Sequence, residues 1–230
     1  MTTTLITGAN KGLGYETARR LIEAGHTVWM GARDETRGRQ SADALGGQFV
    51  HLDVTSDESV AAAAKTIAAA GGLDVLINNA GITGSHSPAA ELTGQDALTV
   101  YDTNVVSIVR TIGAFAPILA GSSAPTVVNV TSGLGSFALV HDPERIESTV
   151  NAPLYTSSKS AVTMLTVQYA RALPQMRINA VDPGYTATDL NGHSGPQTVQ
   201  EGTDAIVDLA TRNGEGPTGT FIDRTGVAPF

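Results

Sequence analysis

The feature that most constrains the fold is a glycine-rich turn between a β-branched segment and an amphipathic helix. Residues 2–7 (TTTLIT) favour a strand, and Gly8, Gly12 and Gly14 follow in the run GANKGLG. Apolar residues between positions 18 and 24 then mark one face of a helix. A strand, a glycine turn and a helix in this order are typical of the start of a dinucleotide-binding unit, where the helix N-terminus faces phosphates.

Each glycine has a distinct physical use in such a unit. Gly8 permits the tight turn, Gly12 lets the backbone approach a pyrophosphate, and Gly14 lets the helix pack close to the strand. The spacing is G-x-x-x-G-x-G, which differs from the commoner G-x-G-x-x-G. A turn that binds nothing is the alternative, and the flanking strand and helix favour nucleotide binding over it.

The rest of the chain alternates strands and helices with short connections. The strands are nearly continuously apolar, which is typical of a parallel sheet covered on both faces. We therefore predict one domain over residues 1–230 with a doubly wound (Rossmann) α/β fold, about seven parallel strands and helices on both faces. Further strands are expected at 26–32, 48–52, 73–77, 126–131, 177–181 and 220–222, and helices at 34–45, 60–70, 94–119, 155–173 and 198–211.

Composition excludes several classes of protein. The net charge of −8 argues against nucleic acid as the main partner. The absence of cysteine excludes disulfides and thiolate chemistry, and the five histidines show no metal-ligand spacing. No apolar run reaches the roughly 18 to 20 residues that a membrane span needs. A strand that starts almost at Met1 leaves no room for a signal peptide, so we expect a cytoplasmic protein. From the histidine spacing we expect no metal site.

Tyr155 and Lys159 form the strongest candidate for a reactive pair. They are four positions apart in the run YTSSK, so on a helix the two side chains share one face. A free Tyr has a pKa of about 10, and a neighbouring cation favours the phenolate. An exposed Tyr beside a solvated Lys is the alternative, because this spacing is common by chance.

Several motifs together resemble a known family. TGANKGLG, NNAG, NVTS and YTSSK, in this order, are similar to motifs of the single-domain short-chain dehydrogenases/reductases. The resemblance extends to LDV at 52–54, Asn104, and DPGYTAT at 182–188, and so spans residues 3–190. The Asn-Lys pair of the glycine turn and the run GARDETRG resemble the NADPH-dependent carbonyl reductase branch.

The resemblance implies four catalytic residues. Tyr155 would protonate a carbonyl oxygen as hydride arrives, and Lys159 would lower the pKa of Tyr155 and bind ribose hydroxyls. Ser132 would hydrogen-bond the substrate oxygen, although a simple turn serine is the alternative. Asn104 would hold a water that relays protons to Lys159, and the alternative is a buried amide whose hydrogen bonds are all satisfied.

The resemblance also implies a cofactor site along the strand ends. Asp53 would accept from the adenine amino group, while Thr188 and the backbone of Thr186 would hold the carboxamide. The full predicted set is Gly8, Asn10, Lys11, Gly12, Leu13, Gly14, Arg33, Arg37, Asp53, Val54, Asn79, Ala80, Gly81, Tyr155, Lys159, Pro183, Gly184, Thr186 and Thr188.

NADP(H) is the predicted cofactor. An NAD site usually has a carboxylate at the tip of the second strand, whereas this strand ends at Gly31-Ala32. Arg33, Arg37 and Lys11 are cations that would reach a 2′-phosphate. We expect the nearby Asp34 to be a helix N-cap rather than a ribose ligand. A solvated helix start is the alternative for both arginines.

The predicted activity is transfer of hydride from NADPH to an aldehyde or ketone, reversible as alcohol oxidation. An NADP(H)-sensing binding protein on the same fold is the alternative, but it would have lost the catalytic residues. A dehydratase or epimerase with a bound, recycled cofactor usually has a larger C-terminal substrate domain than this chain can hold.

The substrate loops are expected at 81–88, 133–154 and 185–195. Ser132 and Tyr155 are 23 positions apart, more than the dozen or so usual in the family, and the extra residues fall at 141–151. This segment would either gate the substrate or decorate the surface. The protein is expected to be a monomer or a homodimer with a hydrophobic or aromatic carbonyl substrate. The expected apolar lining is Ile82, Leu134, Phe137, Leu139, Leu154, Tyr185 and Leu190.

Overall fold

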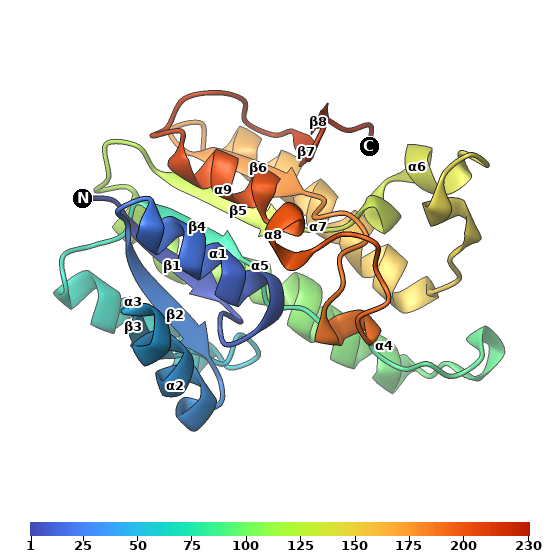
Figure 1. Cartoon of the computed structure of the whole chain (residues 1–230), viewed down its shortest axis with the longest axis horizontal. Helices are drawn as coiled ribbons and strands as arrows, with labels where there is room; N and C mark the ends of the chain where they lie inside the picture. The colour runs from blue at the N-terminus through green and yellow to red at the C-terminus, as the bar shows by residue number, and fades with distance from the viewer.

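A twisted, mostly parallel sheet forms the centre of the molecule (Figure 1). In the computed structural model, which describes residues 1–230, the strand order is β3-β2-β1-β4-β5-β6-β7-β8. The predicted doubly wound α/β fold is confirmed. The strands are β1 (Thr3–Thr7), β2 (Thr27–Ala32), β3 (Gln48–His51), β4 (Val75–Asn78), β5 (Thr126–Val130), β6 (Arg177–Val181), β7 (Phe221–Asp223) and β8 (Gly226–Val227).

The first seven strands are parallel, as predicted. The eighth strand, β8, was not predicted, and it pairs antiparallel with β7. It has only two residues, which is too short to carry an alternating pattern that sequence analysis would detect.

Helices cover both faces of the sheet (Figure 1). Residues of α1, α2 and α9 pack on one face, and residues of α3, α5 and α7 pack on the other. No helix combines the length and apolar character that crossing a membrane would require. The helices are α1 (Gly12–Glu23), α2 (Glu35–Leu45), α3 (Asp57–Ala69), α4 (Gly94–Tyr101), α5 (Ser107–Leu119), α6 (Phe137–His141), α7 (Pro153–Ala172), α8 (Val199–Gly202) and α9 (Asp204–Thr211).

Strand side chains alternate between the two cores. On β1, Leu5 belongs to one buried cluster and Ile6 to the other, and on β4 Leu76 and Ile77 divide in the same way. This is the alternation that a strand geometry imposes. A strand with both faces covered must therefore be apolar at successive positions, which explains the continuous apolar runs of the sequence.

Two helices that were predicted as continuous are interrupted. The helix predicted at 94–119 contains a π-turn, η2 (Asp102–Val106), which separates α4 from α5. The helix predicted at 198–211 is broken at Thr203, whose hydroxyl bonds to the Gln200 carbonyl at 2.8 Å. Side chains that bond to the backbone compete with the helical ladder in this way. Single π-turns within α-helices are frequent at functional sites.

The carboxyl ends of the strands define where a ligand would bind. The chain runs from β1 outward to β2 and β3, and then returns to pair β4 with the other side of β1. Ligands in open α/β sheets bind at such a reversal of strand order. The glycine turn follows β1 and the NNAG segment follows β4, so both lie at this crevice.

Gly14 offers a test of the packing beneath the crevice. An added Cβ there would lie 2.6 Å from both the Asn79 amide nitrogen and the Gly8 carbonyl oxygen, so we expect Gly14→Ala to destabilise the protein by about 1–3 kcal/mol. The control is Gly113→Ala on the exposed face of α5, where an added Cβ meets nothing within 4 Å. It should stabilise by roughly 0.5–1 kcal/mol. Urea unfolding measures both, and a Gly14→Ala protein as stable as the parent would contradict the packing argument.

Candidate active site

The glycine turn has the backbone geometry that its sequence predicts. Gly8 has φ +65° and Gly12 has φ +55°, both in the left-handed region that favours glycine. Helix α1 begins at Gly12, and no side chain caps its first turn. Its first N–H groups are therefore available to an anion.

A cluster of hydrogen bonds joins the glycine turn to the NNAG segment. The Thr7 hydroxyl accepts from the backbone N–H groups of Asn79 and Ala80, each at 3.0 Å. The Asn79 amide donates to the carbonyls of Thr7 at 2.9 Å and Gly8 at 3.2 Å. Asn79 thus holds the loop after β4 against the loop after β1 with its side chain.

A cavity of about 530 Å³ follows this crevice. Most of the predicted cofactor residues line it. They come from the carboxyl ends of β1, β2, β3, β4 and β6 and from α7. Those that line it are Gly8, Asn10, Lys11, Gly12, Leu13, Arg33, Asp53, Val54, Asn79, Ala80, Gly81, Tyr155, Lys159, Pro183 and Thr188.

Four predicted cofactor residues lie outside this lining. Gly14 is buried against Gly8 and Asn79, where it serves packing. Gly184 and Thr186 form the turn after β6, and the buried Thr186 hydroxyl donates to the Pro183 carbonyl at 2.9 Å. Arg37 is the fourth, and its side chain is engaged elsewhere.

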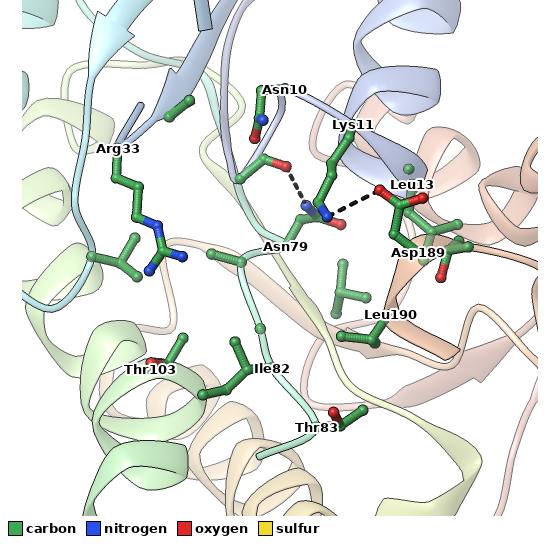
Figure 2. Close-up of a pocket in the computed structure, with 18 of the residues that line it drawn as sticks. Asn10, Lys11, Leu13, Arg33, Asn79, Ile82, Thr83, Thr103, Asp189 and Leu190 are labelled. Atoms are coloured by element: carbon green, nitrogen blue, oxygen red, sulfur yellow. Dashed lines mark hydrogen bonds and ion pairs between the residues drawn. The ribbon is translucent and has the colours of Figure 1, made fainter. Parts of the chain in front are cut away.

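The three predicted phosphate-binding cations differ in their partners. Arg37 on α2 pairs with Asp34 at 2.7 Å, and Asp34 is the N-cap of α2, as expected. Lys11 pairs with Asp189 at 3.0 Å, a partner that sequence analysis missed. Arg33 has no ion pair and reaches into the cavity from the end of β2 (Figure 2). Of the three, Arg33 alone combines a place in the cavity with an unpaired charge.

Asp53 lies near the same end of the cavity. Burial opposes its ionisation, but hydrogen bonds from Thr55 and the charge of Arg33 prevail and lower its pKa. One carboxylate oxygen accepts from the Thr55 N–H at 3.0 Å and the Thr55 hydroxyl at 2.7 Å. The other oxygen makes no such bond, so the predicted contact with adenine stays a prediction that the geometry permits.

Tyr155 and Lys159 lie on α7, as predicted, and both line the cavity. Lys159 is 4% exposed, and its ammonium donates to the Val130 carbonyl at 3.0 Å and lies 5.6 Å from the centre of the Tyr155 ring. Val130 could not be identified from the sequence, because a backbone carbonyl carries no side-chain signal.

The predicted lowering of the Tyr155 pKa by Lys159 stays a prediction, because burial dominates the pKa of this phenol in the structure. Burial raises the pKa of Tyr155 to about 12, although hydrogen bonding to the Ser132 hydroxyl acts in the opposite direction. Burial also lowers the pKa of Lys159 to about 8, which the charge of Asp182 partly offsets. Removal from water is therefore the largest influence on the pKa of both side chains.

Ser132 is brought to Tyr155 by close packing of the segment behind it. It is the N-cap of η3 (Gly133–Gly135), and its hydroxyl accepts from the Leu134 N–H at 3.2 Å. An added Cβ on Gly135 would lie 2.7 Å from the Lys159 carbonyl carbon. The absence of a side chain there lets η3 lie directly on α7, which places the Ser132 and Tyr155 hydroxyls together.

Asn104 connects two walls of the cavity from the π-turn. Its carbonyl oxygen accepts from the Ile82 N–H at 2.9 Å, and its amide donates to the Ile82 carbonyl at 3.0 Å and the Ser158 hydroxyl at 2.9 Å. Both amide donors are thus satisfied within the protein, which favours the alternative of a buried, satisfied amide. A water relay through Asn104 stays a prediction.

A second cavity of about 560 Å³ opens beside the first. Tyr155 lines both, and Ser132 lines the second. Phe137 and Leu139 were expected in the lining but lie elsewhere, since Phe137 is exposed on α6 and Leu139 packs in a small core with Phe221. Ile82 lines the first cavity instead. The apolar lining of the second is Leu13, Leu92, Leu134, Ile146, Val150, Leu154, Tyr185 and Leu190.

The Lys159 pKa predicts an unusual dependence of stability on pH. Between about pH 8 and pH 10.5 the unfolded chain keeps the Lys159 proton and the folded chain has lost it. Stability therefore rises with pH across this window, by about 3 kcal/mol at full titration. Lys159→Met should lack this contribution. Urea unfolding measures the free energy of unfolding of both proteins at about pH 7 and pH 10. If this free energy rises no more with pH in the parent than in Lys159→Met, the burial of a charged Lys159 is contradicted.

The chain is similar in sequence and in structure to several known proteins. Residues 2–198 match the family model of the short chain dehydrogenases. The chain is 36% identical to a short-chain dehydrogenase of Penicillium roqueforti, over 90% of this chain and 87% of that protein. It is 32% identical to a short-chain dehydrogenase/reductase of Saponaria officinalis, over 98% and 95% respectively. The NADPH-bound carbonyl reductase from chicken fatty liver superimposes with a TM-score of 0.89 at 26% identity, over 100% of this chain and 99% of that one. The chain belongs to the short-chain dehydrogenase/reductase family of oxidoreductases.

Proposed function

We propose that this protein is an NADPH-dependent reductase of apolar aldehydes and ketones, with Tyr155 as the general acid. The observation that carries the proposal is the position of Tyr155, which lines both cavities. One cavity runs to the glycine turn, and the other has a largely apolar lining that includes Ser132. A phenol at their junction is the group that both a cofactor and a substrate would meet.

The first cavity fits an NADP(H) molecule in its charge and its backbone. The uncapped first turn of α1 offers N–H groups to a pyrophosphate. Arg33 offers an unpaired guanidinium, which matches the oxygens of a 2′-phosphate. The likeness to an NADPH-bound carbonyl reductase supports the same cofactor. NADPH, when bound, supplies the hydride.

The protonation states suit reduction at neutral pH. With a pKa of about 12, Tyr155 holds its proton and can donate it to the carbonyl oxygen of a substrate. The Ser132 hydroxyl can hydrogen-bond the same oxygen as negative charge develops on it. Lys159, with a pKa of about 8, carries its charge at neutral pH and stabilises the phenolate left after proton donation.

The second cavity favours neutral apolar substrates. Its charged lining residues are the carboxylates Glu147 and Asp182, and neither Lys nor Arg lines it. A sugar phosphate or an acyl phosphate would find no counter-charge there. Hydrophobic or aromatic carbonyl compounds are therefore the proposed substrate class.

Tyr155→Phe tests the acid. The change keeps the ring and removes the transferable proton, so kcat for ketone reduction should fall roughly 10²- to 10⁴-fold while NADPH affinity changes little. The control is Tyr169→Phe on the same helix, whose ring packs against the core, and it should retain activity. Near-normal turnover by Tyr155→Phe would contradict the assignment. A parent protein that binds NADPH but reduces no carbonyl compound would instead be the NADP(H)-sensing alternative.

Arg33→Ala tests the cofactor. Loss of charge-assisted hydrogen bonds to a 2′-phosphate should lower kcat/KM for NADPH by about 10- to 100-fold and leave NADH unaffected. The control is Arg39→Ala on α2, which removes a cation already paired with Glu35 at 2.7 Å. Initial rates with each cofactor decide the matter, and equal use of NADH and NADPH by the parent protein would overturn the proposed preference.

A further inference from the structure

The segment 141–151 forms one wall of the second cavity. It connects α6 to α7 and contains η4 (Ile146–Thr149), the yellow turn beyond the carboxyl ends of the strands in Figure 1. Ile146 and Val150 line the cavity while 55% and 43% exposed. Apolar side chains left open toward a cavity are suited to contact an apolar ligand there.

Few interactions attach this wall to the rest of the protein. The hydrogen bonds of residues 142–151 are local, because they join the segment to itself or to the end of α6. Packing and charge must therefore hold the segment in place. Residues 141–150 are all exposed except Glu147. A carboxylate is an unusual residue to be the most buried member of an exposed segment.

The Glu147 side chain is largely buried between its own segment and the turn that follows Ser132. It is 12% exposed, and its carboxylate is near enough to Gly133 that a Cβ there would lie 2.6 Å from one oxygen. Gly133 directly follows Ser132. Arg145 binds both Glu147 oxygens, with Nη2 at 2.9 Å and Nε at 3.2 Å, which is the strong bidentate form of an ion pair.

Two further carboxylates add to the electrostatic surroundings of Arg145. Hydrogen bonding to Glu147 raises the pKa of Arg145 most, and the charges of Asp182 and Asp223 add to this effect. Asp182 is itself buried at the end of β6. Arg145 therefore pairs with one carboxylate in a region that holds two more acidic side chains. Without Arg145, the Glu147 carboxylate would lose its paired cation while remaining close to Asp182, and like charges in a buried place repel strongly.

We propose that the Glu147 carboxylate, with its charge balanced by Arg145, anchors residues 141–151 against Gly133 as a wall of the substrate cavity, which makes Arg145 a positioning residue for substrate specificity. The proposal rests on the proposed reductase function and deepens it, since it concerns which carbonyl compounds that site accepts. Loss of the anchor releases Ile146 and Val150 from the cavity. Bulky apolar ketones then lose contacts that small ketones never make.

The test compares two methyl ketones, butan-2-one and 2-acetylnaphthalene, with NADPH and the full chain. Arg145→Gln should raise KM for the naphthyl ketone by about 10-fold or more, the usual effect of losing an apolar pocket contact. Its kcat for that ketone, and both constants for butan-2-one, should stay within about twofold because Tyr155 is untouched. Arg145→Lys, which keeps the charge but not the bidentate fork, should lie between Gln and the parent.

Two further variants separate the wall from its anchor. Ile146→Ala removes a wall side chain and should raise KM for the naphthyl ketone alone. Arg212→Gln removes an ion pair with Asp208 on α9, away from the cavity lining, and should change neither ketone. Hydrogen exchange at residues 146–150 should be faster in Arg145→Gln than in the parent.

The outcomes distinguish the two proposals. If the parent reduces both ketones and Arg145→Gln leaves the KM values unchanged, or changes them equally, the anchor is overturned and the reductase function stands. If the parent reduces neither ketone, the reductase function is overturned and the specificity role of Arg145 with it.

Discussion

The burial of the Lys159 ammonium at the end of β5 is the constraint on which the rest of the site depends. A buried charge must find polar partners, and Lys159 finds the Val130 carbonyl at 3.0 Å. The Thr131 hydroxyl donates to the Lys159 carbonyl at 2.9 Å, so that backbone and side chain of one residue hold α7 to β5. Once α7 is fixed there, Tyr155 one turn earlier must face the carboxyl end of the sheet. The close approach of Gly135 to the same residue then brings Ser132 beside it.

On the side of the crevice formed by the glycine turn, hydrogen bonds to backbone groups fix the loops. Thr7 and Asn79 between them bind the loops after β1 and β4, and they leave the first turn of α1 without a cap. Rigid neighbours and free N–H groups are what an anion site needs. The outer wall of the second cavity is a segment whose hydrogen bonds are all local. The two cavities meet at Tyr155, so changes in the loop that walls the second cavity would leave the lining of the first in place.

Structural features that leave a local pattern in the sequence could be predicted from it. The apolar strands, the glycine turn and the i, i+4 spacing of Tyr155 and Lys159 are local, and the structure has them where they were expected. The π-turn at Asn104 was missed because one inserted residue hardly changes the helical period. The pairing of Lys11 with Asp189 joins positions far apart in the chain, so no local sequence pattern predicts it. Arg33 and Arg37 look equivalent in sequence. In the structure, Arg33 at the end of β2 is unpaired, whereas Arg37 in the first turn of α2 pairs with Asp34, the N-cap of that helix. The raised pKa of Tyr155 depends on burial, which a motif does not report.

We propose that Tyr155 stands where hydride and proton reach one carbonyl group, and the most direct measurement follows the hydride. The protein is incubated with NADPH deuterated at both C4 positions and with an apolar ketone, and the alcohol is analysed by mass spectrometry and NMR. The account predicts one deuterium on the carbinol carbon and none on the hydroxyl after exchange with water. An alcohol without deuterium at that carbon, or no alcohol at all, would contradict it.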